Sequence, residues 1–339
     1  MKINRSWLLG ASNDGEGVVG MSLSREHFCA GELPMPEVGA GEVLIQSQYF
    51  ATDPMNHAWA RGVPGRFDAI DVGTPLRGGV AGRVIESQHP KFPEGTAVAG
   101  FLPWSDFNVC DGSDLLGMPL YVVPPDLDVA SGLSALGMTG ICAYLSLTDF
   151  GCFESGDTVV VSGASGAIGG LTCQLAKSFG APVIGLARGP DKCKFVDRLG
   201  VTAAIDITAM DWPESLQAVA KAGVDVFVDN VGDGVLDTLL TQMNRGGRIV
   251  ICGATAHYQA GASISNHLML AISGLTMSGF FYFDMAHRWQ HVRDRLVEGL
   301  RSGAITDVLD IAEGFEQVPE AALGQFLSAN FGRKLIRIS

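Results

Sequence analysis

The chain has 339 residues, of which 47% are hydrophobic and 17% charged, and its formal net charge is −13. This length accommodates two domains, and the composition is that of a globular protein with ample core material. The negative charge argues against nucleic acid or an anionic membrane as a partner, because both bind clustered positive charge. Local groups must therefore hold any anionic ligand against the overall field of the protein.

The sequence carries no sign of export or membrane insertion. Residues 1–17 include acidic side chains where a signal peptide needs an apolar region. No apolar run reaches the roughly 18 residues of a membrane-spanning helix. The seven cysteines are scattered and form no C-x-x-C pair. That usage is typical of reduced thiols, so we expect a cytoplasmic protein.

Residues 1–125 predict a β-rich domain. Glycine and proline are frequent there, and the strand-like runs are GEVLIQSQYF (41–50), AGRVIES (81–87), GTAVAGF (95–101) and LYVVPP (120–125). Turn residues separate these runs at regular intervals, as in all-β units.

In residues 126–304 the pattern differs, because runs typical of buried strands alternate with runs typical of helices. The strands are DTVVVSG (157–163), APVIGLA (181–187), VDVFVDNVG (224–232) and GGRIVICG (246–253), and the helices CQLAKSFGA (173–181) and VLDTLLTQM (235–243). This alternation predicts an α/β fold with a doubly wound parallel sheet. The tail, residues 305–339, ends in a strand, KLIRI, that we expect to return to the first domain.

The segment VVVSGASGAIGG (159–170) reads as a strand, a tight turn and a helix that starts near Ala167. Its glycines Gly163, Gly166 and Gly169 are evenly spaced, unlike the G-x-G-x-x-G of the usual dinucleotide fingerprint. Glycine is needed where a side chain would block a pyrophosphate or the packing of helix on strand, and a helix N-terminus attracts anions. We interpret the segment as a phosphate site; a glycine-rich turn without a ligand is the alternative.

The end of the next predicted strand indicates which dinucleotide is used. An NAD site usually places Asp or Glu there to accept from the ribose hydroxyl. This chain has Arg188 and Lys192 instead, and two cations favour the 2′-phosphate of NADP. A solvated charged turn is the alternative, because Asp191 dilutes the positive charge.

Taken together, the motifs resemble those of a known family. In chain order they are GEVLIQSQYFATDP (41–54), LGMTGICAY (136–144), SGASGAIGG (162–170), GPDKC (189–193), DNVG (229–232), GGRIVICGATAHY (246–258), Gly279-Phe280 with Asp284 and Arg288, and ANFGRK (329–334). Over nearly its whole length the chain is similar to zinc-independent medium-chain dehydrogenases/reductases. The branch is that of leukotriene B4 dehydrogenase, prostaglandin reductase and bacterial curcumin reductase-like enzymes.

The resemblance implies a GroES-like catalytic domain completed by the C-terminal tail, with a Rossmann domain between. Members of the branch use NADPH to reduce the C=C bond of α,β-unsaturated aldehydes and ketones and are commonly dimers. We therefore expect NADPH, a small unsaturated carbonyl substrate and a homodimer. The cofactor contacts expected from the residues and the resemblance together are Gly163, Gly166, Ala167, Ile168, Gly169, Arg188, Lys192, Asn230, Cys252, Gly253, Ala254, Tyr258, Phe281, Tyr282 and Asn330.

We expect no metal site. Zinc-dependent relatives use a cysteine, a His-Glu pair and a second cysteine, but here the first position reads ATD (51–53) and LRGGVAG (76–82) replaces the Gly-His-Glu segment. Cys110 alone cannot build the four-cysteine structural lobe of those relatives. His57 has no evident ligand partners, and we expect a hydrogen-bonding histidine of the surface or pocket.

A metal-free site favours conjugate reduction. Hydride goes to the electrophilic β-carbon, and the enolate oxygen then needs only hydrogen-bond donors before a proton reaches the α-carbon. Tyr258 is the expected catalytic donor, with structural packing as the alternative. Tyr282 and Asn330 match family positions near the nicotinamide; aromatic packing and a turn-forming asparagine are their alternatives.

The segment DPMNHAWA (53–60) departs from the D-P-Y-M-R of many relatives. Met55 replaces a substrate-side tyrosine, and Asn56 follows it. Phe101 and Trp104 are expected to form an aromatic pocket wall or else to pack in the core. We therefore expect a substrate unlike the aromatic or lipid enones of relatives.

The leading hypothesis is an NADPH-dependent enone or enal reductase, and the alternative is an NADPH-dependent quinone oxidoreductase on the same fold. A zinc-free alcohol or ketone reductase comes third. A nucleotide-binding regulatory protein, which would bind NADPH without turnover, is the hypothesis from a different class.

Ile207 generates a first prediction, because relatives carry there a tyrosine that helps to hold the ribose phosphate. We hypothesise that Arg188, often a glycine in relatives, compensates for the missing hydroxyl. Arg188→Ala should then raise the KM for NADPH by about tenfold, the effect of losing one charge-assisted hydrogen bond. An unchanged KM in steady-state kinetics would refute the hypothesis.

Overall fold

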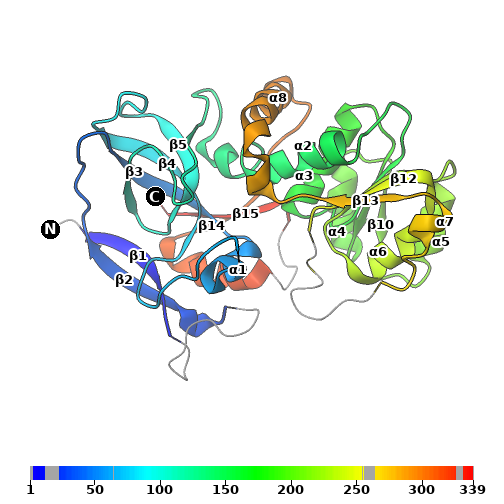
Figure 1. Ribbon diagram of the computed structural model, residues 1–339, viewed down its shortest axis with the longest axis horizontal. Coiled ribbons are helices and arrows are strands. Elements are labelled where there is room, and N and C mark those ends of the chain that lie inside the picture. The colour runs from blue at the N-terminus through cyan, green and yellow to red at the C-terminus, as the bar shows by residue number, and fades with distance from the viewer. Residues whose placement is uncertain are drawn as a thin grey trace. The chain divides into compact units, whose positions relative to one another are not determined.

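The computed structural model describes residues 3–11, 23–63, 65–253, 255, 264–325 and 331–338. They form two compact units (Figure 1). The first unit comprises the described residues within Met1–Leu133, Leu309–Asn330 and Lys334–Ser339, and the second unit those within Ser134–Val308 and Phe331–Arg333. The chain thus leaves the first unit, builds the second and returns.

A seven-stranded sheet dominates the first unit, in the order β14-β15-β3-β4-β5-β7, with β6 paired to β3. The bounds are β3 (Val43–Ala51), β4 (Arg77–Ser87), β5 (Ala97–Pro103), β6 (Phe107–Cys110), β7 (Tyr121–Val122), β14 (Leu309–Glu313) and β15 (Arg333–Arg337). The first unit also contains the antiparallel pair β1 (Ile3–Leu9) and β2 (Phe28–Pro34) and the α-helices α1 (Met55–Arg61) and α9 (Val318–Gly324). The strand predicted in the tail is β15, which pairs with β3.

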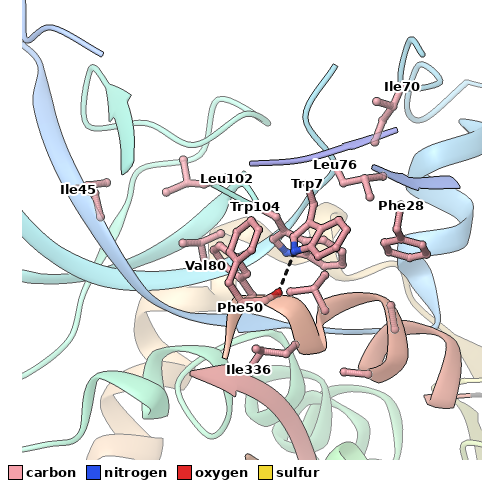
Figure 2. Close-up of a cluster of buried hydrophobic side chains, with 14 of the residues drawn as sticks. Trp7, Phe28, Ile45, Phe50, Ile70, Leu76, Val80, Leu102, Trp104 and Ile336 are labelled. Atoms are coloured by element: carbon pink, nitrogen blue, oxygen red, sulfur yellow. Dashed lines mark hydrogen bonds between the residues drawn. The ribbon is translucent and has the colours of Figure 1, made fainter. Parts of the chain in front are cut away.

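The core of the first unit is an apolar cluster built around aromatic rings (Figure 2). Trp7 stacks on Phe315 with ring centroids 5.4 Å apart, and Phe50 contacts both Phe315 and Trp104. The Trp7 indole Nε1 donates a hydrogen bond of 2.9 Å to the Phe315 carbonyl oxygen. This buried bond joins β1 to the returning C-terminal segment.

The second unit is built on a six-stranded parallel sheet in the order β10-β9-β8-β11-β12-β13. The strands are β8 (Val159–Val161), β9 (Val183–Ala187), β10 (Ala203–Asp206), β11 (Val224–Asp229), β12 (Met243–Ile251) and β13 (Thr276–Gly279). Counted from β8, this is the doubly wound order 3-2-1-4-5-6. In such sheets a ligand binds at the carboxyl ends of the strands where the order reverses, which here is the border between β8 and β11.

Helices lie on both sides of this sheet (Figure 1). They are α2 (Met138–Leu145), α3 (Ala167–Ser178), α4 (Pro190–Arg198), α5 (Trp212–Val219), α6 (Asp233–Leu240), α7 (Met269–Ile272) and α8 (Trp289–Ser302). The helix predicted to run to Met243 ends at Leu240 instead. Met243 is buried and pairs with Val224, so it begins the next strand.

The β-rich first unit and the parallel sheet of the second confirm the predicted α/β fold class. In the part of the chain that the structure describes, no helix has the length and apolar character needed to cross a membrane.

The Trp7 hydrogen bond predicts a measurable contribution to stability. Trp7→Phe keeps the ring stacking but leaves the buried Phe315 carbonyl without its donor, which costs about 1–3 kcal/mol. Trp104→Phe is the matched control, because the Trp104 Nε1 has no hydrogen-bond partner among the described residues. Urea unfolding followed by circular dichroism should show the larger loss for Trp7→Phe; equal losses would contradict this role of the bond.

Candidate cofactor site

The glycine turn joins β8 to α3 at the border between β8 and β11. The helix begins at Ala167, as predicted from the sequence. Gly163 has a φ of +59°, a left-handed conformation that glycine adopts freely. Its carbonyl oxygen accepts the N–H of Gly166 at 2.9 Å. The chain thereby changes from strand to helix within a single short turn.

Gly169 lets the first turn of α3 rest against this loop. A Cβ at residue 169 would lie 2.3 Å from the Gly163 carbonyl oxygen. At the neighbouring Gly170 a Cβ would meet nothing closer than 3.5 Å, which is ordinary contact. The absence of a side chain at Gly169 therefore serves the packing of the helix on the turn.

The first turn of α3 offers N–H groups to a ligand. The N–H groups of Ala167, Ile168 and Gly169 have no acceptor within the helix, and no side chain caps this end. The positive end of the helix dipole favours an anion there. A small cavity adjoins this end and is lined in part by Gly166, Ala167, Phe195 and Gly332. These features fit a pyrophosphate group.

A buried aspartate holds the strand ends beneath the turn. Asp229 is fully buried at the end of β11. One of its carboxylate oxygens accepts the Ser162 hydroxyl at 2.7 Å and the N–H groups of Val231 and Gly232 at 3.0 Å each. Ser162 in turn accepts the N–H of Asn230 at 2.8 Å. Sequence reasoning missed both Ser162 and Asp229; a carboxylate as the last residue of a buried strand was the available signal.

Three predicted cofactor residues lie at this same edge of the sheet. The Asn230 side-chain amide donates to the Ser162 carbonyl oxygen at 2.9 Å. The N–H groups of Cys252 and Gly253 donate to the Asp229 carbonyl oxygen at 2.8 and 3.0 Å. The ends of β8, β11 and β12 are therefore tied together by hydrogen bonds.

The thiol of Cys252 has a lowered pKa. Hydrogen bonds with the side chains of Cys142 and Ser146 hold the pKa of Cys252 below its usual value. Cys142 and Ser146 belong to the segment around the end of α2, so that helix also contacts this edge of the sheet.

The two predicted phosphate-binding cations lie close to one another. Arg188 is exposed directly after β9, and Lys192 is half-buried near the start of α4. Burial, and then the positive charge of Arg188, lower the pKa of Lys192. Two cations close enough to repel are stabilised by a shared anion. Ile207 packs against the apolar cluster of the second unit.

Phe281 and Tyr282, two further predicted cofactor residues, lie in an aromatic group after β13. The Tyr282 ring stacks on Trp289 with centroids 4.3 Å apart, and Phe281 contacts Phe283 at 5.5 Å. Packing thus occupies part of each ring, and contact with a nicotinamide stays a prediction for both. Three predicted residues lie outside the described part of the chain: Ala254, Tyr258 and Asn330.

Two predicted substrate residues are buried in the first unit. Trp104 is 1% exposed and stacks on Phe50. Phe101 is 7% exposed and contacts Trp59 edge-on at 4.4 Å. Both rings therefore contribute to the packing that was their alternative role, and a contact with substrate stays a prediction.

Helix α1 carries the other predicted substrate residues, of which Met55 is half-buried and Asn56 buried. The Asn56 Oδ1 accepts the N–H of Asp53 at 2.6 Å. The adjacent His57 is also buried, and its Nδ1 accepts the N–H of Leu23 at 2.6 Å. Burial lowers the pKa of His57 to about 4, so this histidine is neutral at pH 7. His57 is therefore a buried hydrogen-bonding residue of the first unit.

Within the described ranges, no group of three or more His, Cys, Asp and Glu side chains is placed to hold a metal ion. The second unit contains a glycine turn, the uncapped N–H groups at the start of α3 and, after the adjacent strand β9, the two neighbouring cations Arg188 and Lys192. That donor set fits a dinucleotide with an additional phosphate on its ribose.

Comparison with known protein families gives two matches. Residues 7–118 match the family described as "N-terminal domain of oxidoreductase", and residues 167–298 match the family described as "Zinc-binding dehydrogenase". Together the two matched ranges include most of the first unit and most of the second.

Individual relatives are similar over nearly the whole chain. The NADPH-dependent curcumin reductase of Escherichia coli is 30% identical over 99% of this chain and 97% of its own length. The NADP-dependent 2-alkenal reductase of Nicotiana tabacum is 29% identical over 91% of this chain and 90% of its own. The crystal structure of CurA from Vibrio vulnificus in complex with NADPH superposes with a TM-score of 0.87, at 29% identity and 99% coverage of both chains.

Proposed function

The chain belongs to the zinc-independent branch of the medium-chain dehydrogenases/reductases, and we propose that it reduces the C=C bond of α,β-unsaturated aldehydes and ketones with NADPH. One observation carries this proposal: a glycine turn followed by Arg188 and Lys192 lies in a chain similar from end to end to NADPH-dependent reductases of such substrates. The protein is an NADPH-dependent oxidoreductase.

The second unit supplies the groups that would hold the cofactor. The N–H groups at the start of α3 would hold the pyrophosphate, and Arg188 and Lys192 would hold the 2′-phosphate. Asn230, Cys252 and Gly253 contribute the carboxyl ends of β11 and β12, which Asp229 and Ser162 keep in register. Bound NADPH supplies a hydride, which goes to the β-carbon of the substrate.

The negative charge that develops on the substrate carbonyl oxygen needs hydrogen-bond donors. We assign this role to Tyr258. We propose Met55, Asn56, Phe101 and Trp104 as the substrate contacts of the first unit; Met55 is half-buried and the other three are buried.

We also propose that the protein is a cytoplasmic homodimer. Strand β13 lies at an edge of the parallel sheet, and Leu268 and Ile272, shortly before it in the chain, are 62% and 58% exposed. An edge strand with apolar neighbours supports pairing with a second copy. All seven cysteines are free thiols, which supports a reducing compartment.

Deuterium transfer tests the reaction. With NADPH deuterated at the transferred position and a 2-alkenal, mass spectrometry should find the saturated aldehyde labelled at its β-carbon. NADH should support turnover at most a tenth as fast, because it lacks the phosphate held by two cations, each worth about 1.5–3 kcal/mol. EDTA should leave the rate unchanged.

Two outcomes would overturn the proposal. An allylic alcohol labelled at the carbonyl carbon would identify a carbonyl reductase. Oxidation of NADPH by naphthoquinones, with no turnover of enals or enones, would identify a quinone oxidoreductase.

A further inference from the structure

The segment Phe331–Arg333 belongs to the second unit although the chain on either side belongs to the first. The N–H of Gly332 donates to the Ser165 carbonyl oxygen at 2.8 Å, and Gly332 forms a parallel bridge with Gly166. The N–H of Arg333 donates to the Val308 carbonyl oxygen at 2.8 Å. The Gly332 contacts fix the backbone of the segment on the glycine turn, and the Arg333 bond ties it to Val308.

Gly332 allows this close docking. Its φ is +67°, and a Cβ there would lie 2.2 Å from the Val308 carbonyl oxygen. Any side chain at this residue would push the segment away from Val308. The position of the preceding Phe331 is therefore set by backbone contacts and does not depend on its own ring.

The Phe331 ring lies between two side chains of α4. It contacts the Phe195 ring at 5.4 Å, and the Lys192 ammonium lies 5.9 Å from its centroid. Phe195 is 8% exposed and also lines the cavity at the start of α3. The Phe331 ring thus contacts both the Phe195 ring, which lines the cavity, and the Lys192 ammonium.

An aromatic ring orients an ammonium without neutralising it. The face of the ring attracts the cation through its quadrupole, whereas a carboxylate would cancel its charge. A lysine side chain is otherwise free to rotate about four bonds, and restricting it beforehand lowers the cost of binding an anion. The ammonium is held in this way next to Arg188, whose charge it feels.

We propose that Phe331 is a positioning residue that makes the site selective for adenosine 2′-phosphates, by holding the Lys192 ammonium beside the glycine turn. The inference rests on the proposed function, because it assumes that Lys192 binds the 2′-phosphate of NADPH. It adds the C-terminal return of the chain to the residues that determine cofactor choice.

Calorimetric titration with adenosine 2′,5′-bisphosphate and adenosine 5′-monophosphate tests the inference without turnover. In Phe331→Leu the preference for the bisphosphate should fall about fivefold, corresponding to about 1 kcal/mol of lost cation–π energy, while the monophosphate affinity stays unchanged. Phe331→Tyr should keep the preference of the native chain. Phe179→Leu is the matched control, since Phe179 packs against Tyr144 and Phe153 and should leave the preference unaltered.

A double-mutant cycle separates positioning from a general structural effect. If Phe331 acts through Lys192, Phe331→Leu should have no further effect on the preference in a Lys192→Met background. Equal losses for both ligands, additive effects of the two substitutions, or a preference unchanged in Phe331→Leu would each overturn the inference. A native chain without preference for the bisphosphate would instead contradict the proposed NADPH function itself.

Discussion

A methyl group at residue 169 would lie 2.3 Å from the Gly163 carbonyl oxygen, so α3 can rest against the end of β8 only because Gly169 has no side chain. This contact sets where the helix begins and which way its first N–H groups point. The positive helix end then lies at the border between β8 and β11, the place where a doubly wound sheet binds its ligand. The phosphate site that we propose thus depends on a backbone contact.

The groups around the turn are held in place by the backbone as well. Asp229 bonds to the Ser162 hydroxyl and to N–H groups after β11, and its carbonyl oxygen receives those after β12. Gly332, in the C-terminal return of the chain, also binds the turn, because its N–H donates to the Ser165 carbonyl oxygen. A carboxylate with this many donors is occupied by structural bonds. Arg188 and Lys192 form no ion pair with another described residue, so both cations are available to an anion although the chain has a net charge of −13.

Local pattern was enough to predict the strand–turn–helix unit that starts α3 at Ala167, because buried runs and glycines act over a few residues. It also predicted that the C-terminal strand returns to the first domain, where the structure pairs it with β3. Contacts between distant segments carry no local signal, which is why the Ser162–Asp229 bond and the docking of Phe331 were missed. The same limit applies to Trp104, whose aromatic character fits a pocket wall as well as the core where the structure places it.

The central claim is that the packing of α3 on the glycine turn creates the site for NADPH, and one pair of variants tests it directly. Gly169→Ala places its methyl group against the Gly163 carbonyl oxygen, whereas Gly170→Ala, on the next residue of the same helix, has room. Fluorescence titration should give a Kd for NADPH at least tenfold weaker than native for Gly169→Ala, since a displaced helix end loses more than about 1.4 kcal/mol of phosphate contacts. Gly170→Ala should bind as the native protein does. Equal, native-like affinity in both variants would contradict the account.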